Sequence, residues 1–428
     1  MPLNQPSLCK LLACYHAYSR RRTVTMVTTE SGAIVYRISL LGDVMIGRLV
    51  DALLPTSIAR EAPDSDPEFA AQIVDQSILP KYPRLQGYHH CSPWGNCINL
   101  LKSSDLVIAN LETPLTKSEQ KWEPKVFNYR SHPENVLCLT NLGMGYPRRK
   151  GYVSLANNHI LDWGVEGLAE TVKTLSGVGV DFAGAGRTQD EAEKPALLQL
   201  GGTQIDPKQW NITAWSFSDH PNEWKGIKTF NFIDYTSQGR EKIRSQILAD
   251  RSCQQNEEGP KQESHLKIVS MHWGPNYRWR PAKEIVELAH WLIDECDIDI
   301  IHGHSSHHIQ GVEVYKGKLI VYGCGDFVDD YAVDRNWRND LSAVWRVIVG
   351  SNNEVADQGE RLEVKRLEVY PTRIEQFSAN MKRPDEEGHQ WVAEKFRNLC
   401  DEFGTKVEQE SGDCGSIIVK VKGQAWSS

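Results

Sequence analysis

The sequence lacks several features that would define its class at once. No stretch approaches 18 consecutive apolar residues, so no transmembrane helix and no stable membrane insertion are expected. The ten Cys include no C-x-x-C pair, which argues against a disulfide scaffold, a zinc finger and a redox pair. Basic residues are not in excess, because 48 Lys and Arg against 56 Asp and Glu give a net charge of −8. Nucleic acid is therefore disfavoured as a partner.

The first 29 residues are basic and contain no acidic residue, which is the composition of an organellar transit peptide. An alternative start at Met26 explains the same composition. The apolar run 11–14 is too short for a secretory signal. We predict a flexible or targeting extension over 1–32 and one large domain over 33–425. Reduced thiols favour a cytoplasmic location, with an organellar location as the alternative.

From about Ala33, short apolar runs alternate with helical patterns. Runs rich in Val, Ile, Leu and aromatic residues predict buried strands over 34–41, 106–109, 152–156, 212–217, 266–271, 298–301 and 319–322. Further strands are predicted over 343–349, 362–370 and 416–421. This alternation predicts an α/β fold with layered sheets, in which functional sites collect at the carboxyl ends of strands.

Helices and loops are predicted between these strands. The apolar spacing from Val165 to Leu175 predicts a helix that Gly177 and Gly179 end, and Pro281 opens another. A further helix is predicted over 387–403. The segments 55–67 and 249–264 have little apolar periodicity and are predicted as surface loops.

Polar residues follow nearly every predicted strand. The first strands lead into Asp43, Glu112 and the run Asn157-Asn158-His159, and the later ones into His272 and the run from His302 to His307. Carboxylates, an amide and imidazoles at one sheet edge suit Zn, Mn or Fe, and a shared carboxylate allows a two-metal site.

Taken alone, some of these residues have simpler explanations. Asp43 is also typical of a loop cap, Glu112 before Pro114 of a solvated turn, and Asn157 with Asn158 of a plain turn. The histidines are harder to dismiss, since six of the 14 lie between positions 272 and 308. Ordinary surface or core roles are predicted for His16, His89, His90, His132, His220, His265, His290 and His389.

Five segments in register resemble the CapA family of bacterial capsule synthesis, or poly-gamma-glutamate synthesis, proteins, which are related to calcineurin-like metallophosphoesterases. The order and spacing match over about residues 36–345. The segments are Gly42-Asp43-Val44-Met45-Ile46-Gly47-Arg48, Asn110-Leu111-Glu112-Thr113-Pro114-Leu115, Ser154-Leu155-Ala156-Asn157-Asn158-His159, His272-Trp273-Gly274 and Gly303-His304-Ser305-Ser306-His307.

The resemblance implies a four-layer α-β-β-α metallophosphoesterase-like sandwich in a single large domain, with one or two divalent ions at the strand ends. It implies a general acid or transition-state stabiliser at His159, and substrate-contacting or supporting roles for Arg48 and Asp162. The metal ligands it implies are two carboxylates, an amide and three imidazoles: Asp43, Glu112, Asn158, His272, His304 and His307. His302 and His308 are expected to be bystanders.

Two positions depart from the wider pattern. Metallophosphoesterases usually carry Asp-x-His, whereas Met45 stands two residues after Asp43 and is a poor ligand for a hard ion. A weak first metal site is therefore expected. The usual Gly-Asn-Phe reads Gly325-Asp326-Phe327, which adds a carboxylate.

The predicted function is metal-dependent hydrolysis of a phosphoester or a glutamyl-type amide in a small-molecule or anionic polymer substrate. The alternative is a non-catalytic, metal-binding accessory role in the synthesis of poly-gamma-glutamate or another anionic polymer. A purely structural role for the polar residues is disfavoured, since unrelated turns seldom bring so many donors to strand ends.

Overall fold

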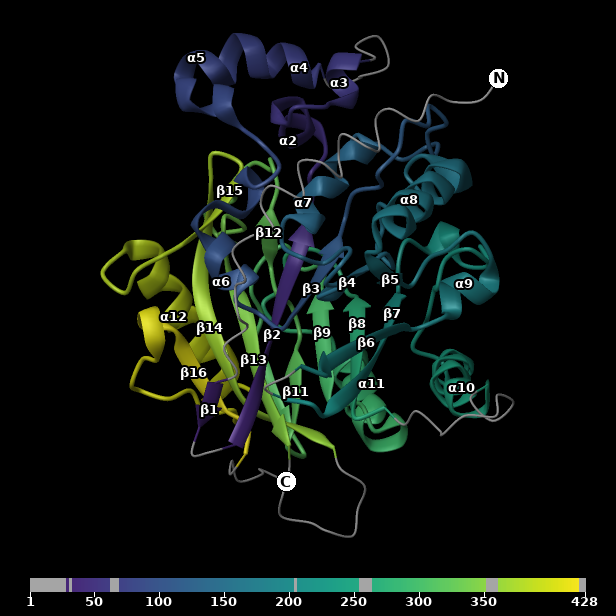
Figure 1. Cartoon of the computed structure of the whole chain (residues 1–428), viewed down its shortest axis with the longest axis vertical. Helices are drawn as coiled ribbons and strands as arrows, with labels where there is room; N and C mark the ends of the chain where they lie inside the picture. Colours follow the sequence, from purple (N-terminus) through teal and green to yellow (C-terminus); the bar gives the residue numbers. More distant parts are fainter. Residues whose placement is uncertain are drawn as a thin grey trace.

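The computed structural model describes residues 28–30, 33–61, 69–203, 206–253, 264–351 and 361–422. Two β-sheets form the centre of this part of the chain, and helices flank them on both sides (Figure 1). The arrangement confirms the predicted α/β fold with two sheets in a single domain.

The first sheet has ten strands, with the hydrogen-bonded order β15-β14-β13-β2-β3-β4-β5. Beside this path, β1 and β12 pair with β2, and β16 pairs with β14. The strands are β1 (Thr28–Glu30), β2 (Ala33–Val44), β3 (Leu106–Leu111), β4 (Gly151–Ser154), β5 (Asp181–Ala183), β12 (Asp326–Val328), β13 (Leu341–Ser351), β14 (Leu362–Glu375), β15 (Ser378–Met381) and β16 (Ile417–Lys420).

The second sheet has six strands in the order β10-β11-β9-β8-β7-β6. The strands are β6 (Ala196–Gly201), β7 (Gln209–Ser218), β8 (Leu266–His272), β9 (Ile300–His304), β10 (Val312–Tyr315) and β11 (Lys318–Val321). Ten of these sixteen strands coincide with predicted runs. The prediction over 298–301 is two residues early, because Ile298 precedes β9.

The α-helices of the described residues range from single turns to four turns or more. They are α2 (Arg48–Leu53), α3 (Ile58–Glu61), α4 (Ala70–Ile73), α5 (Leu79–Lys81), α6 (Ile98–Lys102), α7 (Leu137–Thr140), α8 (Gly164–Val178), α9 (Gln189–Glu193), α10 (Ser237–Cys253), α11 (Lys283–Cys296) and α12 (Glu387–Asp401).

Three hydrophobic cores hold the layers together. The first lies between the outer face of the ten-stranded sheet and helices that include α8, and it buries Trp94 and Leu168. The second lies between the sheets and contains Ile38 of β2 and Ile268 of β8. The third lies between the six-stranded sheet and helices α10 and α11, where Leu288 is buried. Three cores between four layers correspond to the α-β-β-α sandwich.

Strand β2 shows why the predicted strands are continuous apolar runs. Ile38 and Leu40 belong to the core between the sheets, while Leu41 and Val44 belong to the core beneath the helices. Side chains of a strand alternate between two faces, and both faces of β2 are covered. Apolar residues are therefore required at nearly every position.

Other predicted boundaries also differ from the structure. Ile58–Glu61 within the predicted loop 55–67 is helix α3, with Ile58 and Ala59 buried. Helix α10 continues to Cys253, into the predicted loop 249–264. Gly177 lies inside α8, and Gly179 alone ends that helix, because its φ of +72° is the left-handed conformation that glycine adopts without a steric penalty.

Most of the predicted extension over 1–32 lies outside the described residues. Thr28–Glu30 is described and forms β1, which pairs antiparallel with β2. The boundaries 1–32 and 33–425 otherwise stay a prediction. No helix within the described ranges combines the length and apolarity needed to cross a membrane.

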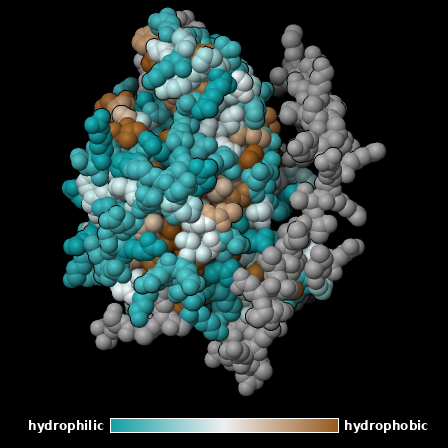
Figure 2. All heavy atoms as spheres, turned by 90° about the vertical axis from the view of Figure 1, so that its left-hand side faces the viewer, coloured by the Kyte–Doolittle hydropathy of each residue, from teal (hydrophilic) through white to brown (hydrophobic). Residues whose placement is uncertain are grey.

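Hydrophilic residues cover most of the face in Figure 2, the left-hand side of Figure 1. Hydrophobic residues form small separate groups on it (Figure 2). Scattered apolar residues of this kind are ordinary on protein surfaces.

Strand β6 offers a direct test of the core between the sheets. Leu198 is 3% exposed and belongs to this core, whereas its neighbour Leu197 points outward and is 53% exposed. We expect Leu198→Ala to lower the free energy of unfolding by about 2–5 kcal/mol, through lost burial and a cavity. Leu197→Ala should change it by about 0.5 kcal/mol or less. Urea denaturation measures both, and equal losses would contradict the described layering.

Candidate metal centre

The candidate site lies where parallel strands of both sheets end. Strands β2, β3 and β4 are parallel neighbours in one sheet, and β7, β8 and β9 in the other. Asp43 lies in β2, Glu112 follows β3, and His272 and His304 are the last residues of β8 and β9. The two edges meet here, since the Ser305 backbone N–H donates to Asp43 Oδ2 at 3.2 Å.

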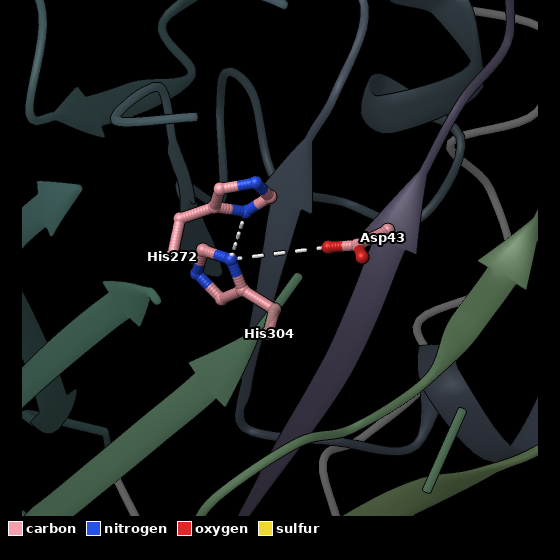
Figure 3. A group of neighbouring side chains, drawn as sticks. All are labelled: Asp43, His272 and His304. Atoms are coloured by element: carbon pink, nitrogen blue, oxygen red, sulfur yellow. Dashed lines mark hydrogen bonds and ion pairs between the residues drawn. The ribbon is translucent and has the colours of Figure 1, made fainter. Parts of the chain in front are cut away.

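Asp43, His272 and His304 form the first group of donors, called here the imidazole group (Figure 3). One ligand atom from each lies within 4.8 Å of the others. Nδ1 of His304 is 3.8 Å from Asp43 Oδ1 and 2.8 Å from His272 Nδ1. The three side chains are buried. Two imidazoles with one carboxylate suit an ion such as zinc.

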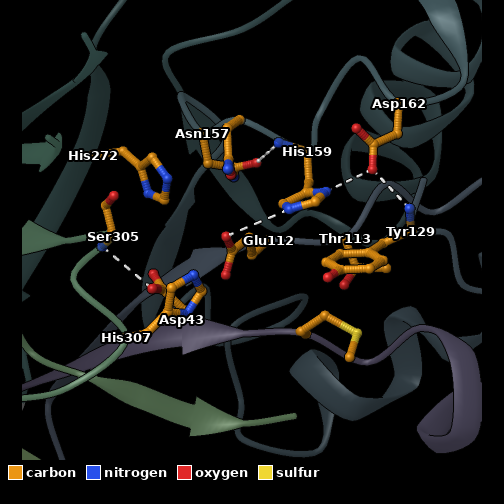
Figure 4. Close-up of polar contacts among 12 residues, drawn as sticks. Asp43, Glu112, Thr113, Tyr129, Asn157, His159, Asp162, His272, Ser305 and His307 are labelled. Atoms are coloured by element: carbon orange, nitrogen blue, oxygen red, sulfur yellow. Dashed lines mark hydrogen bonds and ion pairs between the residues drawn. The ribbon is translucent and has the colours of Figure 1, made fainter. Parts of the chain in front are cut away.

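Asp43, Glu112, His307 and Asp326 form the second group, called here the carboxylate group, and Figure 4 shows its first three members close together. Their ligand atoms also lie within 4.8 Å of one another, and all four side chains are buried. Nδ1 of His307 lies 2.8 Å from Asp326 Oδ1. Asp43 belongs to both groups, so one carboxylate is common to them, as a two-metal site would require.

Several buried polar atoms at the site have no hydrogen-bond partner among the described residues. They include Glu112 Oε1 and Oε2, Asp326 Oδ2 and Asn158 Oδ1. The Nε2 atoms of His272 and His304 are also unpaired, but the Nδ1 atoms of these two rings are the ones that face each other. Buried polar atoms in proteins are almost always paired, because leaving one unpaired is costly. These residues therefore fit a divalent cation, which would satisfy oxygen and imidazole donors together.

The electrostatics also favour a cation. Burial, followed by the charges of Asp43 and Asp326, raises the pKa of Glu112 well above its ordinary value. Burial and then Asp43 raise the pKa of Asp326 well above its ordinary value. Burial raises the pKa of Asp43 too, although His307 opposes this. Three ionised carboxylates repel one another here unless a positive charge lies among them.

The adjacent asparagines have different surroundings. Asn157 is fully buried, and its amide donates to Asn110 Oδ1 at 3.0 Å and to the Leu111 carbonyl at 2.9 Å. Its own Oδ1 accepts the His159 N–H at 3.1 Å. Asn157 therefore fixes the loop, whereas Oδ1 of Asn158 is buried and unpaired, and the role of Asn158 as a metal ligand stays a prediction.

His159 lies beside the carboxylate group without belonging to it (Figure 4). Its Nε2 is 4.0 Å from Glu112 Oε1, and its Nδ1 is 2.6 Å from Asp162 Oδ2. The ring stacks on Tyr129 with centroids 4.0 Å apart. Burial lowers the pKa of His159 to about 4, although the Asp162 charge opposes this. With Nδ1–H donated to Asp162, the Nε2 lone pair faces the site.

Asp162 is fully buried beneath His159. It accepts a hydrogen bond from the Tyr129 backbone N–H at 2.7 Å and forms an ion pair with Lys125. Nζ of Lys125 also contacts the Asn158 carbonyl. These contacts give Asp162 a positioning role toward His159. A direct contact between Asp162 and substrate stays a prediction.

Arg48 follows β2 and opens α2, with a positive φ of 51°. Its Nε is 3.3 Å from Asp330, and its guanidinium lies 5.5 Å from the Tyr129 ring centroid. Arg48 also lines a cavity of about 460 Å³ together with Lys121 and Lys125. The predicted substrate contact of Arg48 is compatible with this position.

His220 is a site neighbour that the sequence interpretation treated as ordinary. Its ring centroid lies 4.8 Å from that of His272, and its Nε2 is 3.4 Å from Ser305 Oγ. Nδ1 of His220 pairs with Asp219, which also accepts the Tyr235 hydroxyl at 2.6 Å. The position of Asp219 and His220 just after β7 was the available signal.

The predicted bystander histidines have partners outside both donor groups. His302 Nδ1 lies 2.9 Å from Ser270 Oγ, and its Nε2 lies 2.8 Å from the Leu41 carbonyl. His308 stacks on Trp337 with centroids 5.0 Å apart. Both rings therefore contribute to packing near the site.

Together, the fold and the two buried donor groups define a two-sheet α/β protein whose strand ends suit divalent cations. The chain belongs to the family described as bacterial capsule synthesis protein PGA_cap, whose sequence profile matches residues 37–331. This confirms the predicted membership of the CapA family.

Named relatives support the same family. The chain is 31% identical over 391 residues to the probable polyglutamine synthesis accessory protein of Mycobacterium tuberculosis (strain H37Rv), covering 87% of this chain and 93% of that protein. It is 25% identical over 258 residues to the capsule biosynthesis protein CapA of Bacillus anthracis, covering 60% and 56%. Identity to the PGA biosynthesis protein CapA of Bacillus subtilis is 27% over 233 residues, covering 54% and 55%.

Metal addition should stabilise this protein. We expect Zn²⁺ or Mn²⁺ to raise the melting temperature of the metal-free chain, with a gain of about 2.7 kcal/mol at a free ion concentration 100 times Kd. Glu112→Gln should gain less, because it replaces a carboxylate with two unpaired oxygens by a neutral amide with a single oxygen. The exposed Glu166→Gln should gain as much as the wild type. Calorimetry measures the gains, and equal values for both variants would contradict the role of Glu112.

Proposed function

We propose that this protein is a metal-dependent hydrolase that acts on an anionic substrate through a phosphoester or a glutamyl-type amide bond. The observation that carries the proposal is His159, which faces Glu112 at 4.0 Å through Nε2. A site that only binds a cation needs metal ligands and nothing more. Proton transfer also requires an oriented imidazole beside those ligands, and His159 is such an imidazole.

The proposed ligands are Asp43, Glu112, Asn158, His272, His304 and His307, with zinc, manganese or iron as the ions that suit them. A divalent ion held by these residues would supply Lewis-acid chemistry, polarising a phosphoryl or acyl oxygen and lowering the pKa of water. The protein contributes a fixed cage for it, since Asn110 donates to Asp43 at 2.8 Å and the Ser305 N–H to its other oxygen.

His159 is the proposed proton-transfer residue. Asp162 accepts the Nδ1–H and holds the ring, while the stacked Tyr129 fixes its plane. Nε2 is thereby left to take a proton from the attacking water or to return one to the leaving group. Lys125 contacts both members of this pair, with its Nζ 3.2 Å from His159 Nδ1, and contributes positive charge through its ion pair with Asp162.

The neighbouring cavity supports an anionic substrate. Its polar lining includes Arg48, Lys121 and Lys125 against a single acidic residue, Glu123. The cavity adjoins His159, because Lys125 contacts that imidazole and Arg48 lies over Tyr129. With three cationic side chains and one acidic side chain in its lining, the cavity favours substrates that carry phosphate or carboxylate groups over cationic substrates.

Replacement of His159 separates catalysis from metal binding. We expect His159→Asn to lower kcat by about 100- to 10,000-fold on phosphoester or glutamyl amide substrates, because proton transfer is lost. The metal content should stay unchanged, since His159 lies outside both donor groups. His290→Asn is the matched control, because His290 lies on α11 and pairs with Glu313. Steady-state kinetics with elemental analysis tests this, and full activity of His159→Asn would overturn the proposal.

Replacement of Lys121 tests whether the cavity binds the anionic substrate. We expect Lys121→Ala to raise KM for an anionic substrate by about tenfold without lowering kcat, because one charge-assisted contact is lost. A neutral analogue should show no change. Lys173→Ala, an exposed change on α8, is the control. An unchanged KM for the anionic substrate would remove the cavity from the proposed binding site.

A non-catalytic accessory role is the second candidate, favoured by the name of the mycobacterial relative, probable polyglutamine synthesis accessory protein. The two candidates differ in one result. Metal-dependent turnover of a phosphoester or glutamyl amide panel that falls in His159→Asn supports the hydrolase. Bound metal with no turnover on any panel member supports the accessory role.

A further inference from the structure

The position two residues after Asp43 does not supply a metal ligand. The Met45 sulfur accepts the Gly47 backbone N–H at 3.2 Å, and the side chain is fully buried. A thioether is in any case a poor ligand for a hard ion. A cation bound by the carboxylate group therefore needs another ligand next to Asp43.

Asp326 lies in the right place to be that donor. Strand β12 runs parallel to β2, and Asp326 is the direct register partner of Asp43. The pairing is tight, since the Asp43 N–H donates to the Gly325 carbonyl at 3.2 Å. A Cβ at Gly42 would lie 1.7 Å from the same carbonyl oxygen, so glycine is required there. This close approach brings a second carboxylate beside Asp43.

Two further side chains complete the environment of Asp326. Nδ1 of His307 lies 2.8 Å from its Oδ1. Opposite them, Glu112 is fully buried, and neither of its oxygens has a hydrogen-bond partner in the described part of the chain. An unpartnered buried carboxylate facing other carboxylates points to a bound cation.

The two donor groups differ in chemistry. The imidazole group offers two imidazoles and the carboxylate of Asp43, whereas the carboxylate group offers three carboxylates and one imidazole. Imidazole-rich sites suit zinc, and carboxylate-rich sites suit harder ions such as manganese. We propose that the site holds two unlike cations, and that Asp326 replaces the ligand missing at Met45 to create an oxygen-rich centre selective for the harder ion.

This inference rests on the proposed metal-dependent function, and the experiment separates the two. Metal-free protein receives one equivalent of Zn²⁺ and is titrated with Mn²⁺, while electron paramagnetic resonance measures free Mn²⁺ and elemental analysis counts both metals. The wild type should bind one Zn²⁺ and one Mn²⁺. Asp326→Asn should keep the Zn²⁺ and bind Mn²⁺ at least about 100-fold more weakly, since a direct ligand outweighs the outer contacts that contribute 10–100-fold.

Three further variants sharpen the test. Asp326→Glu keeps the carboxylate and should keep Mn²⁺ binding, which separates lost charge from a damaged fold. His304→Ala should lose Zn²⁺ and keep Mn²⁺. Asp105→Asn should bind both ions, because Asp105 accepts the Arg37 N–H at the opposite end of β3.

The outcomes are distinct. Undiminished Mn²⁺ binding by Asp326→Asn, or loss of both ions from it, would overturn the assignment of Asp326 while leaving the proposed hydrolase standing. A wild type that binds neither ion would overturn the proposed metal-dependent function itself.

Discussion

Asp43 is the carboxylate on which the whole site depends. It is 1% exposed, lies at the junction of the two sheets and belongs to both donor groups. Asn110 and the Ser305 N–H hold its two oxygens from opposite sheets. Because a buried carboxylate is costly unless it is paired, this one residue links the packing of the sheets to the proposed binding of cations.

The same constraint explains the residues around it. Several carboxylates and imidazoles buried at one place destabilise the folded state unless cations offset the negative charge and pair with the oxygen and nitrogen atoms. The layers that surround them are apolar and buried, so packing of the layers positions the strand ends that carry these side chains. His159 is held beside this cage by Asp162 and Tyr129, which is the preorganisation that proton transfer requires.

Much of this arrangement could be predicted from local sequence. Apolar runs identified the central strands because both faces of strands such as β2 are covered. The residues that follow or end parallel strands were predicted to lie together, and these are Asp43, Glu112, His272 and His304. The pairing of Asp326 with Asp43 could not be predicted, since it depends on a close contact between Gly42 and Gly325, far apart in sequence.

Other features escaped prediction for related reasons. His220 lies beside His272 because β7 and β8 are parallel neighbours, and this pairing is not visible in the sequence around His220. Helix α3 has a single turn, too short to show helical periodicity, and it is placed by burial of Ile58 and Ala59. Tertiary contacts determine both features.

The central claim is that the strand ends around Asp43 form a metal centre. Anomalous X-ray diffraction from crystals of the wild-type protein soaked in Zn²⁺ and Mn²⁺ tests it most directly. The account predicts one zinc peak within the imidazole group and one manganese peak within the carboxylate group, with Asp43 next to both. Crystals of the same protein with no anomalous peak beside Asp43 would contradict it.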